Sequence, residues 1–198
     1  MNLVDPWNVA FLVGFLIYVG TRHHFERRVA AERGDDAPTP SEAPAAERPL
    51  LGLVMLGSLL IPVLYLLTPL FAFADRPTPH ALRAGGTVVL VGALWLFWRS
   101  HADLGRNWSV TLDLRSEHEL VTRGVYRRMR HPMYAAIWAF AVAQAMILPN
   151  WVAGFSALVT FAPLYFVRVP REEAMMRREF GDAYTEYEGR TWRVLPRP

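Results

Sequence analysis

Residues 50–73 read LLGLVMLGSLLIPVLYLLTPLFAF, a run of 24 residues without one charged side chain. A helix needs roughly 20 apolar residues to cross about 30 Å of hydrocarbon, so this run is long enough to span a membrane. The stretch from Trp151 to Val169 meets the same criterion. The sequence therefore predicts an integral membrane protein with an all-α fold.

Three shorter apolar stretches lie around these two runs, at Trp7–Gly20, Ala84–Trp98 and Met133–Leu148. Each is shorter than an ideal span, so it must include flanking residues or thin the bilayer locally. No positive charge precedes the first stretch and no small-residue cleavage site follows it, which argues against a cleaved signal peptide. We expect five transmembrane helices.

The arginines define the orientation. All 21 basic residues are Arg, and 19 of them fall in segments 21–49, 99–132 and 168–198. In a five-span chain these three segments share one side, and the other side receives only Arg76 and Arg83. Basic residues gather on the cytoplasmic side of membrane proteins. We therefore expect an external N-terminus and a cytoplasmic C-terminus, whereas a four-span or six-span chain would split the arginine-rich segments.

Composition excludes several functions. The chain has no Cys, which removes disulfides and thiolate metal sites. It also lacks P-loop and GxGxxG motifs, so we expect neither a metal nor a nucleic-acid partner. Residues 1–98 form a three-span N-terminal part, in which 32–48 is Pro- and Ala-rich and predicts a mobile cytoplasmic loop. Residues 99–198 contain the last two spans and nearly all the candidate chemistry.

After Pro170 the pattern becomes that of an amphipathic helix of about 18 residues. At 100° per residue, one face collects mostly apolar residues with two acids, and Glu173 lies at its edge. A carboxylate on a buried face is costly unless it is paired, so these acids are anomalous. The residues of that face are Glu172, Met176, Glu179, Phe180, Ala183 and Tyr187.

Two constellations are candidates for chemistry. In the first, His131 precedes Pro132, a residue suited to the first turn of a helix, and Tyr134 shares a helix face with His131. The free amides of that first turn are able to receive a polar ligand group. In the second, Arg168 and Glu172 lie four residues apart. The alternatives are an interfacial anchor for the first and a surface ion pair, with Arg168 extending to the interface, for the second.

Other polar features favour structural roles. Pro149-Asn150 predicts a tight turn between the last two spans. Gln144 lies within the fourth span, where a lone amide is typical of a helix–helix hydrogen bond.

The C-terminal half resembles the isoprenylcysteine carboxyl methyltransferase family, whose relatives include phospholipid N-methyltransferases. The resemblance covers about residues 100–198, and it lies in the order and spacing of several short motifs. These are His118-x-Leu120-Val121, Tyr126, Arg130-His131-Pro132-x-Tyr134, a two-helix hairpin, Arg168-x-x-x-Glu172-Glu173, Phe180-Gly181 and Tyr184-x-x-Tyr187.

The resemblance implies a cytoplasmic site for S-adenosyl-L-methionine and assigns roles by position. Arg168 would contact the substrate, and Arg168 and Glu172 would be the catalytic pair. Where the eukaryotic members carry a cofactor-contacting Gln, this chain has Thr111. The cofactor-binding residues implied are His118, Glu119, Leu120, Val121, Gly124, Tyr126, His131, Pro132, Met133, Tyr134 and Glu172.

The same resemblance favours a lipid-like or amphiphilic carboxylate as methyl acceptor, reached from the bilayer. The absence of Lys and the wealth of Ala and Arg fit a GC-rich bacterial genome, so we expect this bilayer to be a bacterial inner membrane. A phospholipid or other amine, or a thiol, is the alternative acceptor and would require a base such as Glu173, His131 or Tyr134. An NADPH-dependent membrane reductase, with Arg127, Arg128 and Arg130 on the 2′-phosphate, and a non-enzymatic scaffold or transporter are further alternatives. The sequence predicts no oligomeric state.

Overall fold

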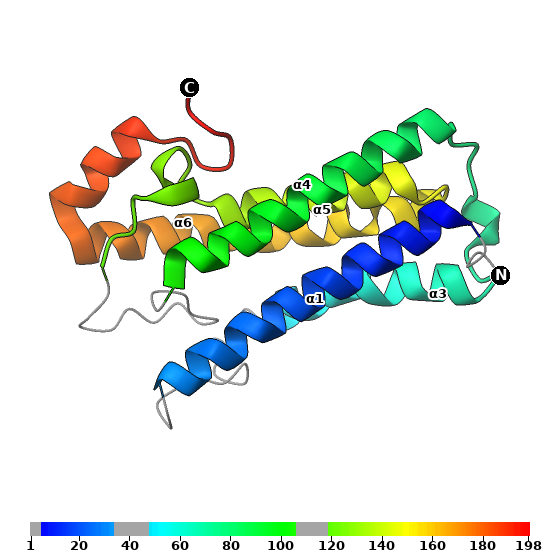
Figure 1. Ribbon diagram of the computed structural model, residues 1–198, viewed down its shortest axis with the longest axis horizontal. Helices are drawn as coiled ribbons and strands as arrows, with labels where there is room; N and C mark the ends of the chain where they lie inside the picture. Colours follow the sequence, from blue (N-terminus) through cyan, green and yellow to red (C-terminus); the bar gives the residue numbers. More distant parts are fainter. Residues whose placement is uncertain (1–4, 34–47, 106–118) are drawn as a thin grey trace.

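The structure, a computed structural model, describes residues 5–33, 48–105 and 119–198. Within these ranges the chain is helical, and its bridges are two isolated pairs, Asp75 with Asn150 and Met129 with Trp192. Figure 1 shows the helices as a long bundle. They are α1 (Pro6–Arg33), α2 (Arg48–Met55), the π-helical turn η4 (Leu56–Leu60), α3 (Ile61–Leu67), η5 (Ala72–Ala74), α4 (His80–Leu104), η7 (Gly124–Arg127), α5 (Pro132–Ile147) and α6 (Trp151–Arg190).

Three helical stretches of the described chain are long and apolar enough to cross a membrane: Arg48–Leu67, α4 and α6. α5 is apolar but has only 16 residues, and α1 has 28 residues of mixed character. The spans predicted at 50–73, 84–98 and 151–169 are therefore present as long apolar helices. The count of five spans and the orientation remain predictions.

One predicted boundary was wrong. The second apolar run was expected to be helical to Phe73, but α3 ends at Leu67 and Thr68 is extended, with φ −134° and ψ 160°. Pro69 follows Thr68, and the residue before a proline is pushed out of the helical region. The third predicted span includes flanking residues, which was one of the two expected alternatives, because α4 runs for 25 residues. α4 therefore needs no local thinning of the bilayer.

The π-helical turn η4, between α2 and α3, is hydrogen-bonded to α5 and α6. Pro62 has no amide hydrogen, so the α-type ladder is interrupted where η4 meets α3. The carbonyl of Gly57 accepts hydrogen bonds from Gln144 Nε2 at 3.1 Å and Ser156 Oγ at 2.6 Å. The predicted role of Gln144 in a helix–helix hydrogen bond is confirmed.

The turn between α5 and α6 is as tight as predicted. α5 ends at Ile147 and α6 begins at Trp151, with Asn150 as its N-cap. The Asn150 side chain accepts from the amide of Ala153 at 2.9 Å and donates to Asp75 Oδ1 at 2.8 Å. This turn is therefore fixed to the segment that connects α3 with α4.

The predicted C-terminal helix was wrong in its start and in its face. α6 continues through Pro170 without a break, and its one non-helical residue is Gly181, with φ +51° and ψ −124°. Glycine adopts this backbone conformation at no steric cost, whereas other residues rarely do. Glu173, expected at the edge of the inward face, is fully buried, and Glu179, expected on that face, is exposed.

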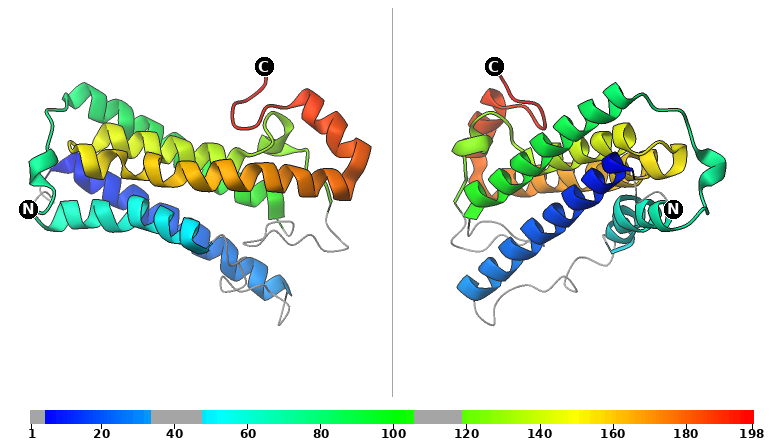
Figure 2. Two further views of the ribbon diagram at one scale, coloured as in Figure 1. Left: turned by 180° about the vertical axis from the view of Figure 1, so that it is seen from behind. Right: turned by 45° about the vertical axis from the view of Figure 1, so that its right-hand side comes forward.

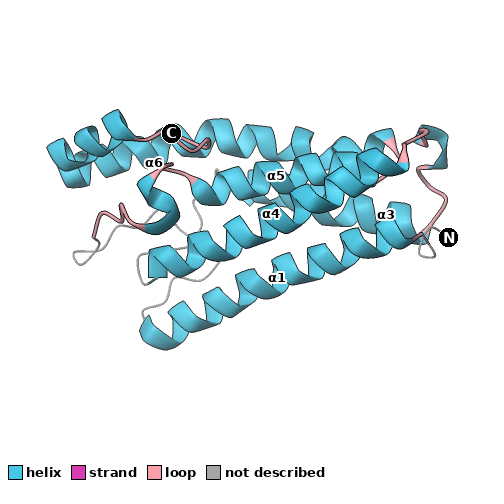
Figure 3. Cartoon of the chain, turned by 45° about the horizontal axis from the view of Figure 1, so that its top comes forward, coloured by secondary structure: helices cyan, strands magenta, loops and turns pink. Residues whose placement is uncertain are grey.

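The break at Gly181 turns the chain back along the bundle, so that the end of α6 and the C-terminal tail lie beside η7 (Figures 1 and 2). The C-terminal end of α4 lies at this same end of the molecule, opposite the N-terminus and the α3–α4 connection (Figure 3). The predicted mobile loop at 32–48 lies mostly outside the described residues, as do His118 and Thr111.

Candidate active site

The first constellation lies at the start of α5. His131 is the N-cap residue, with an extended φ of −124°, and Pro132 occupies the first helical position. Pro132 disfavours the helical conformation for the residue before it, so the helix begins after His131. Pro132 and Tyr134 are buried, whereas His131 and Met133 are half-buried. The His131 and Tyr134 rings lie 5.7 Å apart, as their spacing predicted.

The predicted pair on α6 meets this constellation at Glu172. Glu172 Oε1 accepts from Tyr134 Oη at 2.5 Å and from Arg168 Nε at 2.9 Å. Its second oxygen lies 3.6 Å from His131 Nδ1. Three of the residues that the sequence singled out therefore meet at the carboxylate of the fourth, Glu172. The Glu172 side chain is 18% exposed, so this carboxylate still reaches the surface.

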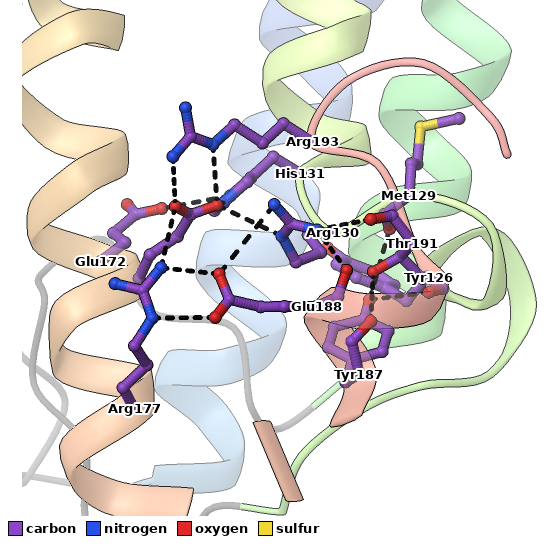
Figure 4. A network of polar contacts seen from close by, with 11 residues as sticks. Tyr126, Met129, Arg130, His131, Glu172, Arg177, Tyr187, Glu188, Thr191 and Arg193 are labelled. Atoms are coloured by element: carbon purple, nitrogen blue, oxygen red, sulfur yellow. Dashed lines mark hydrogen bonds and ion pairs between the residues drawn. The ribbon is translucent and has the colours of Figure 1, made fainter. Parts of the chain in front are cut away.

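Glu173 is the centre of a second, more deeply buried cluster, and Figure 4 labels its partners Arg130, His131 and Arg193. It accepts from Arg193 through both oxygens, at 3.0 and 2.7 Å, and from Arg130 Nε at 3.2 Å. Its Oε1 also lies 3.3 Å from His131 Nε2. The imidazole of His131 is thus held between two adjacent carboxylates, one at each ring nitrogen.

Burial and charge act in opposite directions on Glu173. Its side chain is only 1% exposed, and burial by itself would raise the pKa of the carboxyl group. Hydrogen bonds from His131 and Arg193 outweigh that effect and hold the pKa far below its ordinary value. α6 has 40 residues, about twice the number that one membrane crossing needs. Glu173 follows the apolar part at 151–169 and lies outside it.

The end of α6, after the Gly181 break, packs beside this cluster. Glu188 pairs with Arg177 across the Gly181 break through two bonds of 2.8 and 2.7 Å. The buried Tyr187 donates to the carbonyl of Tyr126 at 2.7 Å. The fold-back therefore connects η7 to both halves of α6 (Figure 4).

Gly124 has a structural role in η7. Its φ is +59°, and an added Cβ would lie 2.0 Å from the Asp103 carboxylate. That carboxylate accepts from the amide of Val125 at 2.9 Å. Tyr126 is buried beside it, with its hydroxyl donating to the carbonyl of Ser100 at 3.3 Å. Gly124 and Tyr126 thus fix the conformation of η7 and its packing against the end of α4.

The predicted cofactor stretch at 118–121 is only partly described. Glu119 is exposed, and Leu120 and Val121 are half-buried in the segment before η7. His118, which begins that motif, lies outside the described residues. The described ranges contain no group of three His, Cys, Asp or Glu side chains arranged to hold a metal ion.

Sequence reasoning missed Arg193 and the central place of Glu173. Arg130 belongs to one of the motifs that carry the resemblance, but the role offered for it was that of a phosphate ligand in the alternative reductase. The signal for Glu173 was present, because a second acid beside an apolar helix face requires a partner. Nothing in the sequence singled out Arg193, which joins the cluster only because the chain turns back at Gly181.

Aromatic side chains continue from Tyr134 toward the apolar parts of α5 and α6. Trp138 lies 5.0 Å from Phe161 and 5.7 Å from Tyr165, measured between ring centroids. Tyr165 meets Tyr134 edge-on at 5.9 Å. Leu50, Leu51 and Val54 of the α2 region pack against this group. The Glu172 cluster therefore lies at the polar end of an aromatic layer.

Comparison with known proteins places this site in a known context. Residues 86–178 match the model of the isoprenylcysteine carboxyl methyltransferase family. The chain is 32% identical over 114 residues to protein-S-isoprenylcysteine O-methyltransferase B of Arabidopsis thaliana, covering 57% of each chain. It is 28% identical over 152 residues to a probable enzyme of the same name from Oryza sativa subsp. indica, covering 70% of this chain and 79% of the relative.

A solved structure shows the same fold. The eukaryotic intramembrane Ras methyltransferase, an isoprenylcysteine carboxyl methyltransferase, superimposes with a TM-score of 0.60 at 21% identity. The superposition covers 98% of this chain and 69% of the other. The likeness thus extends to helices that precede the matched motifs.

Proposed function

We propose that this chain, which over residues 86–178 belongs to the isoprenylcysteine carboxyl methyltransferase family of membrane methyltransferases, methylates the carboxylate of a lipid-like or amphiphilic acceptor. The donor is S-adenosylmethionine, and the reaction takes place at the cytoplasmic face of a bacterial inner membrane. The observation that carries the proposal is the meeting of His131, Tyr134 and Arg168 at the partly exposed carboxylate of Glu172.

The residues present fit such a donor. Glu172 offers a partly exposed carboxylate, which complements a positively charged ligand. Tyr134 and Arg168 hold one of its oxygens and His131 faces the other, so its orientation is fixed before a ligand arrives. A fixed carboxylate requires little reorganisation on binding. We therefore assign Glu172, Tyr134 and His131 to the cofactor.

Arg168 is assigned to the acceptor. When bound, S-adenosylmethionine supplies a methyl group on a sulfonium, so transfer forms a carbon–oxygen bond, breaks a carbon–sulfur bond and leaves a neutral thioether. An ionised carboxylate has no proton to lose, so the site needs no general base. The planar guanidinium of Arg168 suits bidentate contact with a carboxylate. Its role is to hold the acceptor in line, which lowers the barrier by positioning.

The aromatic layer supports a lipid-like acceptor. Tyr134, Trp138 and Tyr165 connect the Glu172 cluster with the apolar parts of α5 and α6. An amphiphile whose apolar part lies among the spans would present its polar end at Arg168. The donor would reach Glu172 from the aqueous side.

The first test is calorimetric titration of the detergent-purified chain with S-adenosylhomocysteine, with NADPH titrated in parallel. We expect saturable binding of the former and none of the latter. Glu172→Gln should weaken binding about tenfold, because it removes one charge-assisted interaction. Glu179→Gln is the matched control, since Glu179 is an exposed acid on the same helix. An NADPH signal would replace the proposal with the reductase.

The second test distinguishes the acceptors. The purified chain is incubated with labelled S-adenosylmethionine and three amphiphiles that share one apolar tail and end in a carboxylate, an amine or a thiol. We expect label on the carboxylate alone, as a base-labile ester. Label on the amine or thiol would assign the acceptor to the alternative class.

A further inference from the structure

The C-terminal tail crosses the start of α5 as a short strap, defined here as residues 191–198. The backbone amides of Arg130 and His131 donate to the carbonyls of Trp192 and Arg193, each at 2.8 Å. The amide of Arg197 donates to the carbonyl of Arg128 at 2.9 Å. The strap thus pairs with the residues that immediately precede Pro132.

The strap also sends one side chain into the buried cluster. Arg193 is 51% exposed, yet it grips both oxygens of Glu173, which is 1% exposed. Two parallel bonds of this kind fix the plane of a carboxylate, which a single point charge does not do. Arg193 therefore determines how Glu173 is turned.

The orientation of Glu173 determines that of His131. Glu173 Oε1 lies 3.3 Å from His131 Nε2, and the other ring nitrogen lies 3.6 Å from Glu172 Oε2. A rotation of the Glu173 carboxylate would therefore release one side of the imidazole. Arg130 donates to Glu173 through Nε alone, and its Nη1 donates to the carbonyls of Glu188 and Thr191. Arg130 does not provide a second bidentate grip.

We propose that Arg193 is a positioning residue of the methyl-donor site, which acts through Glu173 to hold His131 against Glu172. The inference rests on the proposed function, because it assumes that His131 and Glu172 bind the donor. The donor site then includes the strap, which lies beyond the residues matched by the family model.

The test measures S-adenosylhomocysteine affinity by calorimetry and thermal unfolding by circular dichroism for the full chain in detergent. Arg193→Ala should weaken binding about tenfold, the loss expected for a charge-assisted contact. Arg193→Lys keeps the charge without the fork, so we expect partial recovery. The control is Arg190→Ala, since Arg190 pairs with Glu186 on the surface, where the two side chains are 57% and 75% exposed.

A double-mutant cycle separates positioning from general stability. If Arg193 acts through Glu173, then Arg193→Ala should add little to the loss caused by Glu173→Gln. Additive losses would overturn the inference, and so would a drop in affinity that only follows a drop in melting temperature. Wild-type binding by Arg193→Ala would overturn it while leaving the proposed function intact. If the unaltered chain fails to bind, the proposed function fails and the inference falls with it.

Discussion

Glu172 and Glu173 are neighbours in sequence but occupy different environments. Glu172 is partly exposed and is held by Tyr134 and Arg168, whereas Glu173 is buried and is contacted by four cationic or imidazole groups. A partly exposed carboxylate is available to a ligand, while a buried and fully paired one is a structural support. We therefore expect Glu172 to bind the ligand and Glu173 to support the site.

Arg168 gives the first prediction at this scale. Arg168→Ala should lower turnover at least about 100-fold while changing S-adenosylhomocysteine affinity less than about threefold, because the side chain orients the acceptor. Single-turnover methylation and calorimetry on the same preparation measure the two effects. Arg171→Ala is the control, since Arg171 is exposed three residues away. A collapse of cofactor affinity in Arg168→Ala would mean that Arg168 supports Glu172 instead.

Glu173 gives a prediction about pH. Its folded-state pKa lies below the ordinary value of 4.5, so its contribution to stability is present above pH 4.5 and is lost as the pH falls toward the folded pKa. At pH 7, Glu173→Gln should lower the free energy of unfolding by about 3 kcal/mol, because the largely buried Arg130 loses its charged partner. Below pH 4.5 the difference in free energy of unfolding between wild type and variant should become smaller.

Thermal unfolding in detergent at pH 7 and at about pH 3 measures that difference, because most of the stabilisation is lost only well below pH 4.5. Glu179→Gln serves as the control, because Glu179 is exposed and should leave stability unchanged at both pH values. An equal difference at the two pH values would show that the carboxylate charge contributes nothing to the stability of the cluster.

Sequence spacing predicted the residue pairs within single helices. His131 with Tyr134 and Arg168 with Glu172 are three and four residues apart, and local geometry places each pair on one face. The family resemblance, and not spacing, implied that the two pairs share one site, where the structure joins Tyr134 to Glu172 across 38 residues. Arg193 followed from neither, since its approach depends on a tertiary turn.

At the scale of elements, the docking of α2 and η4 on α6 depends on Gly57. A Cβ at this position would meet Thr160 Oγ1 at 2.0 Å and the carbonyl oxygen of Ser156 at 2.6 Å. Gly57→Ala should therefore separate the helices and lower the melting temperature, at a cost of about 1–3 kcal/mol for overpacking. Gly52→Ala is a matched control, because nothing lies within 4 Å of its added Cβ. Equal melting temperatures for the two variants would contradict this account.

The elements themselves were predictable where a local rule acts alone. Apolar runs located α4 and α6, and the Pro149-Asn150 pair located the turn before α6. The break in α6 was predicted at Pro170 but lies at Gly181. A proline within a helix removes one hydrogen bond and the helix continues, whereas a positive φ at Gly181 reverses the chain direction. Amphipathic periodicity carries no information on which of the two occurs.

At the scale of the molecule, the two ends of the bundle carry different charge. The end that holds Glu172 also receives the C-terminus and the end of α4, and Arg76 and Arg83 lie at the other end, beside the α5–α6 turn and α1 (Figure 1). Arg83 is buried there and donates hydrogen bonds to Asp5, Asn8 and the carbonyl of Ile147. The arginine-poor end is thus closed by internal pairing, and the arginine-rich end contains the candidate site.

This polarity predicts the orientation in the membrane, and the absence of Cys makes it directly measurable. In intact bacterial cells expressing the chain, a membrane-impermeant maleimide should label Thr78→Cys, in the α3–α4 connection, once the outer membrane is permeabilised. It should label Asp182→Cys, an exposed position beyond the Gly181 break, only after the inner membrane is also opened. The expectation follows from the excess of arginine near Asp182, because basic segments remain on the cytoplasmic side. The reverse labelling would place the Glu172 cluster outside the cell, away from the cytoplasmic methyl donor, whereas labelling of both positions from one side would rule out an odd number of crossings between them.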